Sequence, residues 1–169
     1  MTQYINQAQA KKATGLSYLG GIATSSKIKK GLKYDEMTYI LYLAPADRSG
    51  YEVCPGRSEE CTAACLNESG HNRIDIHENT INKARITKTK LFFENRPFFM
   101  SWLIDELRSA QKKAIAAGMT FSVRLNGTSD LSPEQFHLDG KNILEIFPDV
   151  QFYDYTKVYK RIQLTKKYS

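Results

Sequence analysis

Three cysteines lie close together in the sequence and are the only cysteines of the chain. Cys54, Cys61 and Cys65 follow a C-x6-C-x3-C spacing within a polar segment that also holds Arg57. An odd number of thiols in one short segment is a poor disulfide framework, whereas thiolates suit soft or borderline metals. Three thiolates on one loop leave one iron of a cubane cluster open to a further ligand. We therefore predict a metal centre here and favour a [4Fe-4S] cluster.

Zinc is the alternative metal. His71 lies six residues after Cys65 and would complete a Cys3His tetrahedron, which is a common structural zinc site. The protein would then be a zinc-binding module for nucleic acid or a host protein. A net charge of +6 and a basic cluster at Lys27, Lys29 and Lys30 fit such an anionic partner. A metal that only staples a loop is a third reading, and the cysteine spacing alone does not choose among them.

Two further groups of polar residues follow strands predicted later in the chain. Arg124 and the residues after it supply a guanidinium, an amide, hydroxyls and a carboxylate, while Tyr155 and Lys157 share one face of the last predicted strand. We expect them to hold a small polar or anionic ligand at the open iron. The candidate ligand-binding residues are Arg124, Asn126, Ser129, Asp130, Tyr155 and Lys157. The alternative reading is turn chemistry at Asn126 to Asp130 and a solvated strand end after it.

A helix predicted before the middle strand carries a third polar group. Arg85, Lys88 and Thr89 share one of its faces by their spacing. They would either neutralise the negative charge of a cluster or form an exposed surface face, and the sequence favours the surface.

Strands and helices alternate along the predicted chain. Strands are expected at residues 38–43, 119–125 and 150–155, and helices at 74–94, 97–118, from 132–135 onward and at 142–147. This alternation predicts an α/β fold with a small parallel or mixed sheet, or a partial (β/α) barrel. Ligands bind at the carboxyl ends of strands in such folds. The cysteine loop and the two polar strand ends should therefore meet at one site.

The length and composition fit one domain over residues 1–169, with residues 1–35 loosely structured. Hydrophobic residues make up 41% of the chain, and no apolar run approaches the roughly 20 residues that span a bilayer. We therefore expect no membrane partner. The polar N-terminus lacks a secretory signal, and unpaired thiols suit a reducing compartment, so the predicted location is the cytoplasm.

Four blocks of the sequence resemble small phage proteins of the mycobacteriophage gene product eighty-eight group. They are YLAPADRSGYEVCPGRSEECTAACL, ARITKTKLFFENRPFFM, VRLNGTSDL and FPDVQFYDYTK, and they lie between residues 37 and 157. The cysteine triplet also resembles the cluster-binding loop of radical S-adenosylmethionine enzymes, although their usual spacing is C-x3-C-x2-C. These resemblances imply a phage-encoded protein of the host cytoplasm with a [4Fe-4S] cluster, S-adenosylmethionine as a further cofactor, and redox or radical chemistry. Whether the protein is an enzyme stays open.

Overall fold

A four-stranded sheet lies at the centre of the fold. The structure is a computed structural model and describes residues 6–22, 31–65 and 80–161. The sheet has the order β1-β2-β3-β6, with β1 (Gly20–Gly21), β2 (Glu36–Leu41), β3 (Thr120–Arg124) and β6 (Gln151–Phe152). The last three strands are parallel and β1 is antiparallel to β2. The predicted α/β fold with a mixed sheet is confirmed, and within the described residues the sheet is open rather than a closed barrel.

Strands β2 and β3 are central because their side chains suit burial on both faces. All of β2 after Glu36 is buried, and Tyr39 pairs with Val123 in the parallel register. β-branched and aromatic residues pack well at such positions, and in β3 the residues Ser122 and Val123 are buried beside them. The hydroxyls of Thr38 and Ser122 lie 3.0 Å apart across the two strands. Because the Ser122 hydroxyl donates to Glu36 Oε1 at 2.8 Å, it accepts from the Thr38 hydroxyl, and both are satisfied inside the sheet.

The long helix α6 (Arg96–Ala116) packs against the sheet and supplies more of the core than any other described element. It begins where the side chain of Asn95 accepts a hydrogen bond from the Phe98 N–H, with Pro97 in its first turn, and the chain turns away at Gly118 with φ +67°. The prediction of a helix at 97–118 is confirmed. Its fully buried side chains are Phe99, Met100, Trp102, Leu103, Ile104 and Leu107. Each such burial contributes about 1.5–3 kcal/mol.

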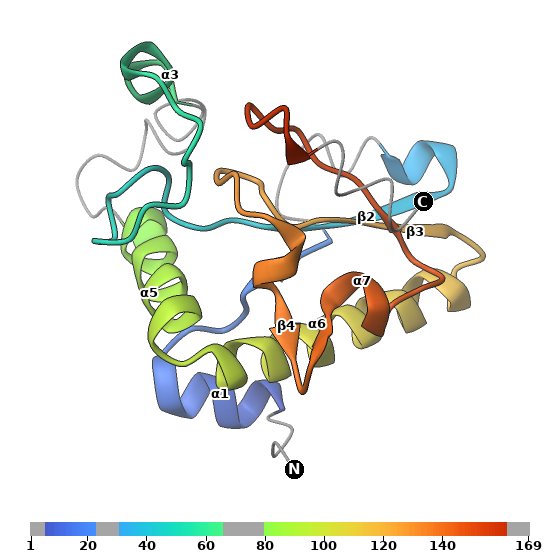
Figure 1. Cartoon of the computed structure of the whole chain (residues 1–169). Helices are drawn as coiled ribbons and strands as arrows, with labels where there is room; N and C mark the ends of the chain where they lie inside the picture. The colour runs from blue at the N-terminus through green and yellow to red at the C-terminus, as the bar shows by residue number, and fades with distance from the viewer. Residues whose placement is uncertain (1–5, 23–30, 66–79, 162–169) are drawn as a thin grey trace.

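Helix α5 (Thr80–Glu94) precedes α6 and runs nearly crosswise to it at one end of the sheet (Figure 1). The prediction of a helix at 74–94 holds from residue 80, and its first part lies outside the described residues. Phe92 of α5 meets Phe99 of α6 and Phe136 with ring centroids 5.1 and 4.8 Å apart. This aromatic cluster fixes α5 against the core.

Part of the N-terminal stretch is regular structure, which the expectation of loose structure over 1–35 did not include. Helix α1 (Gln7–Thr14) starts with a reciprocal capping box between Asn6 and Gln9. Glu106 of α6 then accepts hydrogen bonds from the Leu19 and Gly20 N–H groups at 2.9 and 3.1 Å, which holds β1 at the sheet edge. A short 3-10 turn, η1 (Leu32–Tyr34), leads into β2. No helix in these described parts of the chain is long and apolar enough to cross a bilayer.

The segment between β3 and β6 differs from its prediction. The helix expected from 132–135 is a single 3-10 turn, η3 (Pro133–Gln135), because the Ser132 side chain makes no capping bond. A hairpin of β4 (His137–Leu138) and β5 (Lys141–Asn142) follows, joined by Asp139 and Gly140 at positive φ. The short helix α7 (Ile143–Ile146) confirms the prediction at 142–147 and is capped reciprocally by Asn142 and Glu145. Strand β6 ends at Phe152, earlier than expected.

Candidate functional site

The loop after β2 folds back on itself and returns Cys54 to the strand end. Ala46 has φ +55°, and the Val53 N–H donates to the Ala46 carbonyl at 3.0 Å, which closes the loop. The Ala46 N–H in turn donates to the Cys54 sulfur at 3.4 Å, and the Cys54 N–H donates to Glu52 Oε1 at 2.7 Å. The Cys54 thiol is therefore held in place by its own loop.

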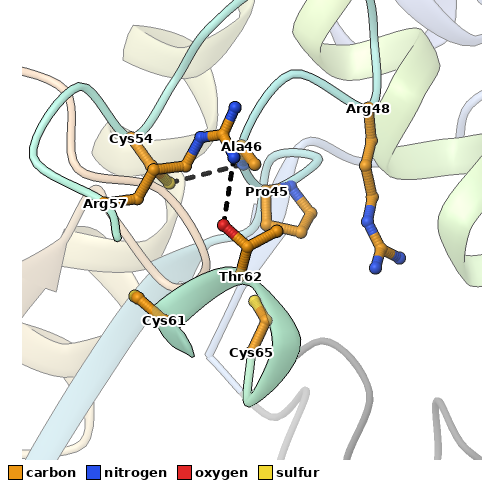
Figure 2. A pocket seen from close by; sticks show the side chains of 8 residues that line it. All are labelled: Pro45, Ala46, Arg48, Cys54, Arg57, Cys61, Thr62 and Cys65. Carbon is orange, nitrogen blue, oxygen red and sulfur yellow. Dashed lines mark hydrogen bonds between the residues drawn. The ribbon is translucent and has the colours of Figure 1, made fainter. Parts of the chain in front are cut away.

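A short helix, α3 (Glu59–Ala63), carries the second cysteine and ends just before the third. Ser58 caps it, since its hydroxyl accepts a hydrogen bond from the Cys61 N–H at 3.2 Å. Cys61 and Cys65 are one helical turn apart and share one side of α3 and its end, facing the Cys54 loop (Figure 2). The i, i+4 spacing thus places two thiols opposite the first.

Arg57 ties the Cys54 loop to α3. Its Nε donates to Glu52 Oε2 at 2.8 Å, and its two terminal nitrogens donate to Asp47 Oδ2 and Thr62 Oγ1, each at 3.0 Å. Figure 2 shows the bond to Thr62 crossing between the two segments. A rigid guanidinium that bonds to three partners fixes the spacing of the segments that carry the cysteines. Sequence reasoning noted Arg57 only as a polar residue and missed this role.

The three cysteines are half-buried and line one small space of about 30 Å³, which is about the room of one water. Burial raises the pKa of the Cys54 thiol, the Ala46 N–H opposes that rise, and the nearby Glu52 and Cys65 add to it. Among the described residues, no group of three His, Cys, Asp or Glu side chains is close enough to hold a single metal ion. His71 lies outside those residues. The thiols thus face a common space without forming a compact single-ion site.

The loop after β3 is built around the side chain of Asn126, which is 2% exposed. Its oxygen accepts hydrogen bonds from the Ser129 hydroxyl at 2.7 Å and the Leu131 N–H at 2.9 Å, and its nitrogen donates to the Leu131 carbonyl and to Asp154. All the hydrogen-bonding capacity of the amide is therefore used within the loop and its neighbour. The structural roles of Asn126 and Ser129 fit the alternative reading of turn chemistry only in part, since Ser132 makes no capping bond to a following helix. Ligand binding by these residues stays a prediction.

Gly127 and Asp130 also have structural partners. A Cβ at Gly127 would lie 2.5 Å from the Tyr42 ring and 2.8 Å from the Leu41 carbonyl, so the close approach that this glycine permits is to its own chain. Asp130 accepts hydrogen bonds from the buried Arg161 side chain and from the Lys157 N–H. Asp130 thus anchors the segment after β6.

Arg124 and Tyr155 face the same pocket from two chain segments. The Arg124 guanidinium lies 4.8 Å from the centre of the Tyr155 ring and 3.6 Å from Asp154 Oδ1. Burial raises the pKa of Asp154 to about 6, while the hydrogen bond from Asn126 and the charges of Arg124 and Arg161 oppose the rise. Because β6 has already ended, the face predicted from strand alternation does not apply: Thr156 lines the pocket beside Tyr155 and Lys157.

All nine residues singled out in the sequence lie on the wall of one larger pocket of about 550 Å³. They are Cys54, Cys61, Cys65, Arg124, Asn126, Ser129, Asp130, Tyr155 and Lys157. In Figure 1 the α3 segment and the turn after β6 lie on the side of the sheet away from α6. Gly56 touches the segment after β6, since a Cβ there would lie 2.9 Å from Val158. The three polar strand ends therefore meet, as expected, and the binding of a ligand there stays a prediction.

The polar face of α5 is turned toward the cysteine loop. Thr89 is fully buried and accepts a hydrogen bond from the Ala44 N–H at 2.8 Å, and Lys88 is buried with its nitrogen 4.9 Å from the centre of the Tyr18 ring. Arg85 lies over Tyr42 at 5.2 Å, close enough to Cys65 for their charges to interact. The reading of this face as exposed surface is therefore wrong for Lys88 and Thr89.

A family model described as Gene product 88 matches residues 4–167. The match confirms the resemblance to phage gene product 88 proteins over nearly the whole chain. It does not address the likeness of the cysteine loop to radical S-adenosylmethionine enzymes. No curated protein and no solved structure matches the chain.

Proposed function

The chain belongs to the gene product 88 family, and we propose that it is a phage iron-sulfur protein that binds a [4Fe-4S] cluster through Cys54, Cys61 and Cys65. One observation carries the proposal: every cysteine of the chain is half-buried on a wall shared by the water-sized space and the larger pocket. Cysteines without a binding role would be expected to scatter through the core as small apolar residues.

A single zinc ion and a cluster need different spacings of the thiols. Zinc-sulfur bonds of about 2.3 Å place the sulfurs of a tetrahedral site about 3.8 Å apart. The described residues contain no such compact group. Thiolates that bind three different irons of a cluster stand farther apart, and the space that the cysteines share with the larger pocket offers room for it.

The surroundings of the thiols also suit an anionic centre. The Ala46 N–H already points at the Cys54 sulfur at 3.4 Å, and hydrogen bonds to sulfur help to set the potential of a cluster. Arg57 lies on the same wall, and Arg85 interacts with Cys65. Arg85 would offset part of the negative charge of three thiolates and sulfide, whereas the charge of Arg57 is already balanced by Glu52 and Asp47.

An iron without a cysteine ligand would face the larger pocket, where a small polar or anionic ligand would meet it. When bound, such a cluster supplies electron transfer or, with S-adenosylmethionine as the family likeness of the loop implies, radical chemistry. The second possibility has its own test, because S-adenosylmethionine that binds the open iron must change the EPR signal of the reduced cluster. An unchanged EPR signal would exclude S-adenosylmethionine as a ligand of the cluster, and it would not contradict the presence of the cluster.

The proposal is tested by replacing the cysteines one at a time with serine in anaerobically reconstituted protein. We expect each variant to lose most of the broad visible absorption of the cluster, since each thiolate holds a separate iron. Ser129→Ala is the matched control, because Ser129 lies in the same pocket wall with its hydroxyl already bonded to Asn126. Full cluster absorption in all three cysteine variants would overturn the proposal.

A second candidate is a Cys3His zinc module that binds nucleic acid or a host protein, favoured by the charge of +6 and the spacing of His71 from Cys65. It predicts that His71→Ala releases the metal as completely as Cys65→Ser does. An iron-loaded protein that keeps its metal after the His71 change would exclude it.

A further inference from the structure

The polar groups on the wall of the larger pocket are of two kinds. Asn126, Ser129 and Asp130 direct their side-chain atoms to partners within the chain. Arg124, Tyr155 and Lys157 line the same pocket, and each keeps a side-chain donor that makes no hydrogen bond within the described residues. A ligand would meet this second group, because its charged and phenolic donors are not used within the described part of the chain.

Arg124 is the strongest donor of the second group. Its Nε is buried without a hydrogen-bond partner, and its nearest carboxylate oxygen, on Asp154, is 3.6 Å away, which is too far for a good hydrogen bond. A buried N–H without a partner is rare in proteins. That nitrogen is closed to solvent, so a carboxylate or phosphate oxygen entering the pocket would bond the terminal nitrogens of the guanidinium, whose side chain is 20% exposed. The planar group suits such two-oxygen anions.

Tyr155 adds a flat surface beside this cation. Its side chain is 70% exposed, one face of its ring carries the Arg124 guanidinium at 4.8 Å, and the ring lines the pocket. The exposed ring leaves apolar surface in contact with water, and a flat ligand would cover that surface. Heteroaromatic rings stack on the planes of tyrosine and arginine side chains. Lys157 lies two residues farther on and supplies a second positive charge at the rim.

The acidic groups on the same wall are offset within the chain. Asp130 pairs with the buried Arg161, and the pKa of Glu60 is lowered first by hydrogen bonds from its own backbone and from Ser58, with Lys157 adding only a smaller attraction. The pocket volume of about 550 Å³ also falls in the range of roughly 300–1,000 Å³ that is usual for small-molecule sites. Charge and size therefore both admit an anion of moderate size.

We propose that this pocket binds an anion attached to a flat heteroaromatic ring, as in a nucleotide. Arg124 and Lys157 bind the anionic group, and the ring stacks on Tyr155. This inference rests on the proposed function only in that the ligand shares its pocket with the cysteines; the contacts that select it do not involve the metal.

Isothermal titration calorimetry with adenosine monophosphate, adenosine and ribose 5-phosphate tests the inference. The monophosphate should bind at least about tenfold more tightly than either fragment, because only it uses both the cations and the ring. Arg124→Gln should remove most of the gain over adenosine, and Tyr155→Ala most of the gain over ribose 5-phosphate. Tyr159→Ala and Lys160→Gln are matched controls, since these exposed residues lie on the same segment outside the pocket wall, and they should leave the affinity unchanged.

Equal affinities for the monophosphate and ribose 5-phosphate would overturn the role of the ring, and no binding of any of the three probes would overturn the whole inference. Iron is measured in every sample, so the two proposals fail separately. Iron-loaded protein that binds no nucleotide contradicts only this inference. If protein without iron binds the monophosphate through Arg124 and Tyr155, the result supports this inference and contradicts the proposed iron-sulfur cluster.

Discussion

Two loops meet at the same pocket and differ in how they use their polar groups. The loop after β3 (residues 125–132) spends its amide, hydroxyl and carboxylate on contacts within the chain, with Asn126 at its centre. The loop after β2 (residues 42–65) presents three half-buried thiols to open space and is held together by its own Arg57. The first loop is a scaffold, and the second carries the reactive groups.

This difference divides the residues that the sequence nominated. Asn126, Ser129 and Asp130 position the pocket wall, whereas the cysteines and the Arg124 side of the pocket keep capacity for a ligand. Mutations in the first set should therefore cost stability, and mutations in the second set should cost binding.

Asn126→Ala should have the largest effect on stability. Removing a buried amide leaves the Ser129 hydroxyl and the Leu131 N–H and carbonyl without their partner, and we expect a loss of about 2–4 kcal/mol in the free energy of unfolding. Urea denaturation measures it. A loss below about 0.5 kcal/mol would show that the loop does not depend on this side chain.

Asp154→Asn should change how stability depends on pH. Because burial raises the pKa of Asp154 to about 6, the folded protein binds this proton more tightly than the unfolded chain does. The stabilising contribution of Asp154 is complete below its ordinary pKa of 3.8 and is lost as the pH rises through about 6. Asn126, Arg124, Arg161 and the Tyr155 N–H face this carboxyl and reduce the shift without reversing it.

The stability of the wild type relative to Asp154→Asn should therefore fall between pH 4 and pH 7 by on the order of 2–3 kcal/mol. Denaturation series at four or five pH values measure the difference. Parallel curves for the two proteins would mean that Asp154 has an ordinary pKa in the folded state.

Gly127→Ala should destabilise the fold by about 1–3 kcal/mol, since the added methyl group would overlap the Tyr42 ring and the Leu41 carbonyl. Thermal unfolding compares it with the wild type. Tyr42→Ala removes the ring and should recover part of the loss in the double variant. A double variant in which the two losses simply add would place the strain elsewhere.

Cys61→Ser should have the smallest effect on stability once metal has been removed. The side chain is half-buried at the mouth of the pocket, and we expect a change within about 0.5 kcal/mol. Denaturation in chelator and reductant measures it. A loss above about 2 kcal/mol in the free energy of unfolding would show that Cys61 stabilises the fold, and the two loops would then not differ as described.

The sequence predicted the elements whose ends carry strong local signals. Pro97 and Gly118 bound α6 correctly, and the alternation of strands and helices indicated the mixed sheet. The same alternation predicted that the cysteines and the two polar strand ends meet at one site, because parallel strands end at the same edge of a sheet.

Long-range contacts explain what was missed. β1 exists because Glu106, far along the chain, binds the Leu19 and Gly20 N–H groups, and no local pattern shows that. The hydrogen bonds of the Asn126 side chain likewise include one to Asp154, which lies far along the chain and could not be read from the loop sequence. The Asp139-Gly140 dipeptide is typical of a β-hairpin turn. The strands on either side have only two residues each, which is too short to show the alternation of apolar and polar side chains that marks a strand.

The central claim is that the three cysteines hold an iron-sulfur cluster, and the most direct test is the iron, sulfide and zinc content of protein purified without oxygen. The account predicts about four iron and four sulfide per chain, and neither in a variant with all three cysteines changed to serine. One zinc per chain with no iron or sulfide would contradict it.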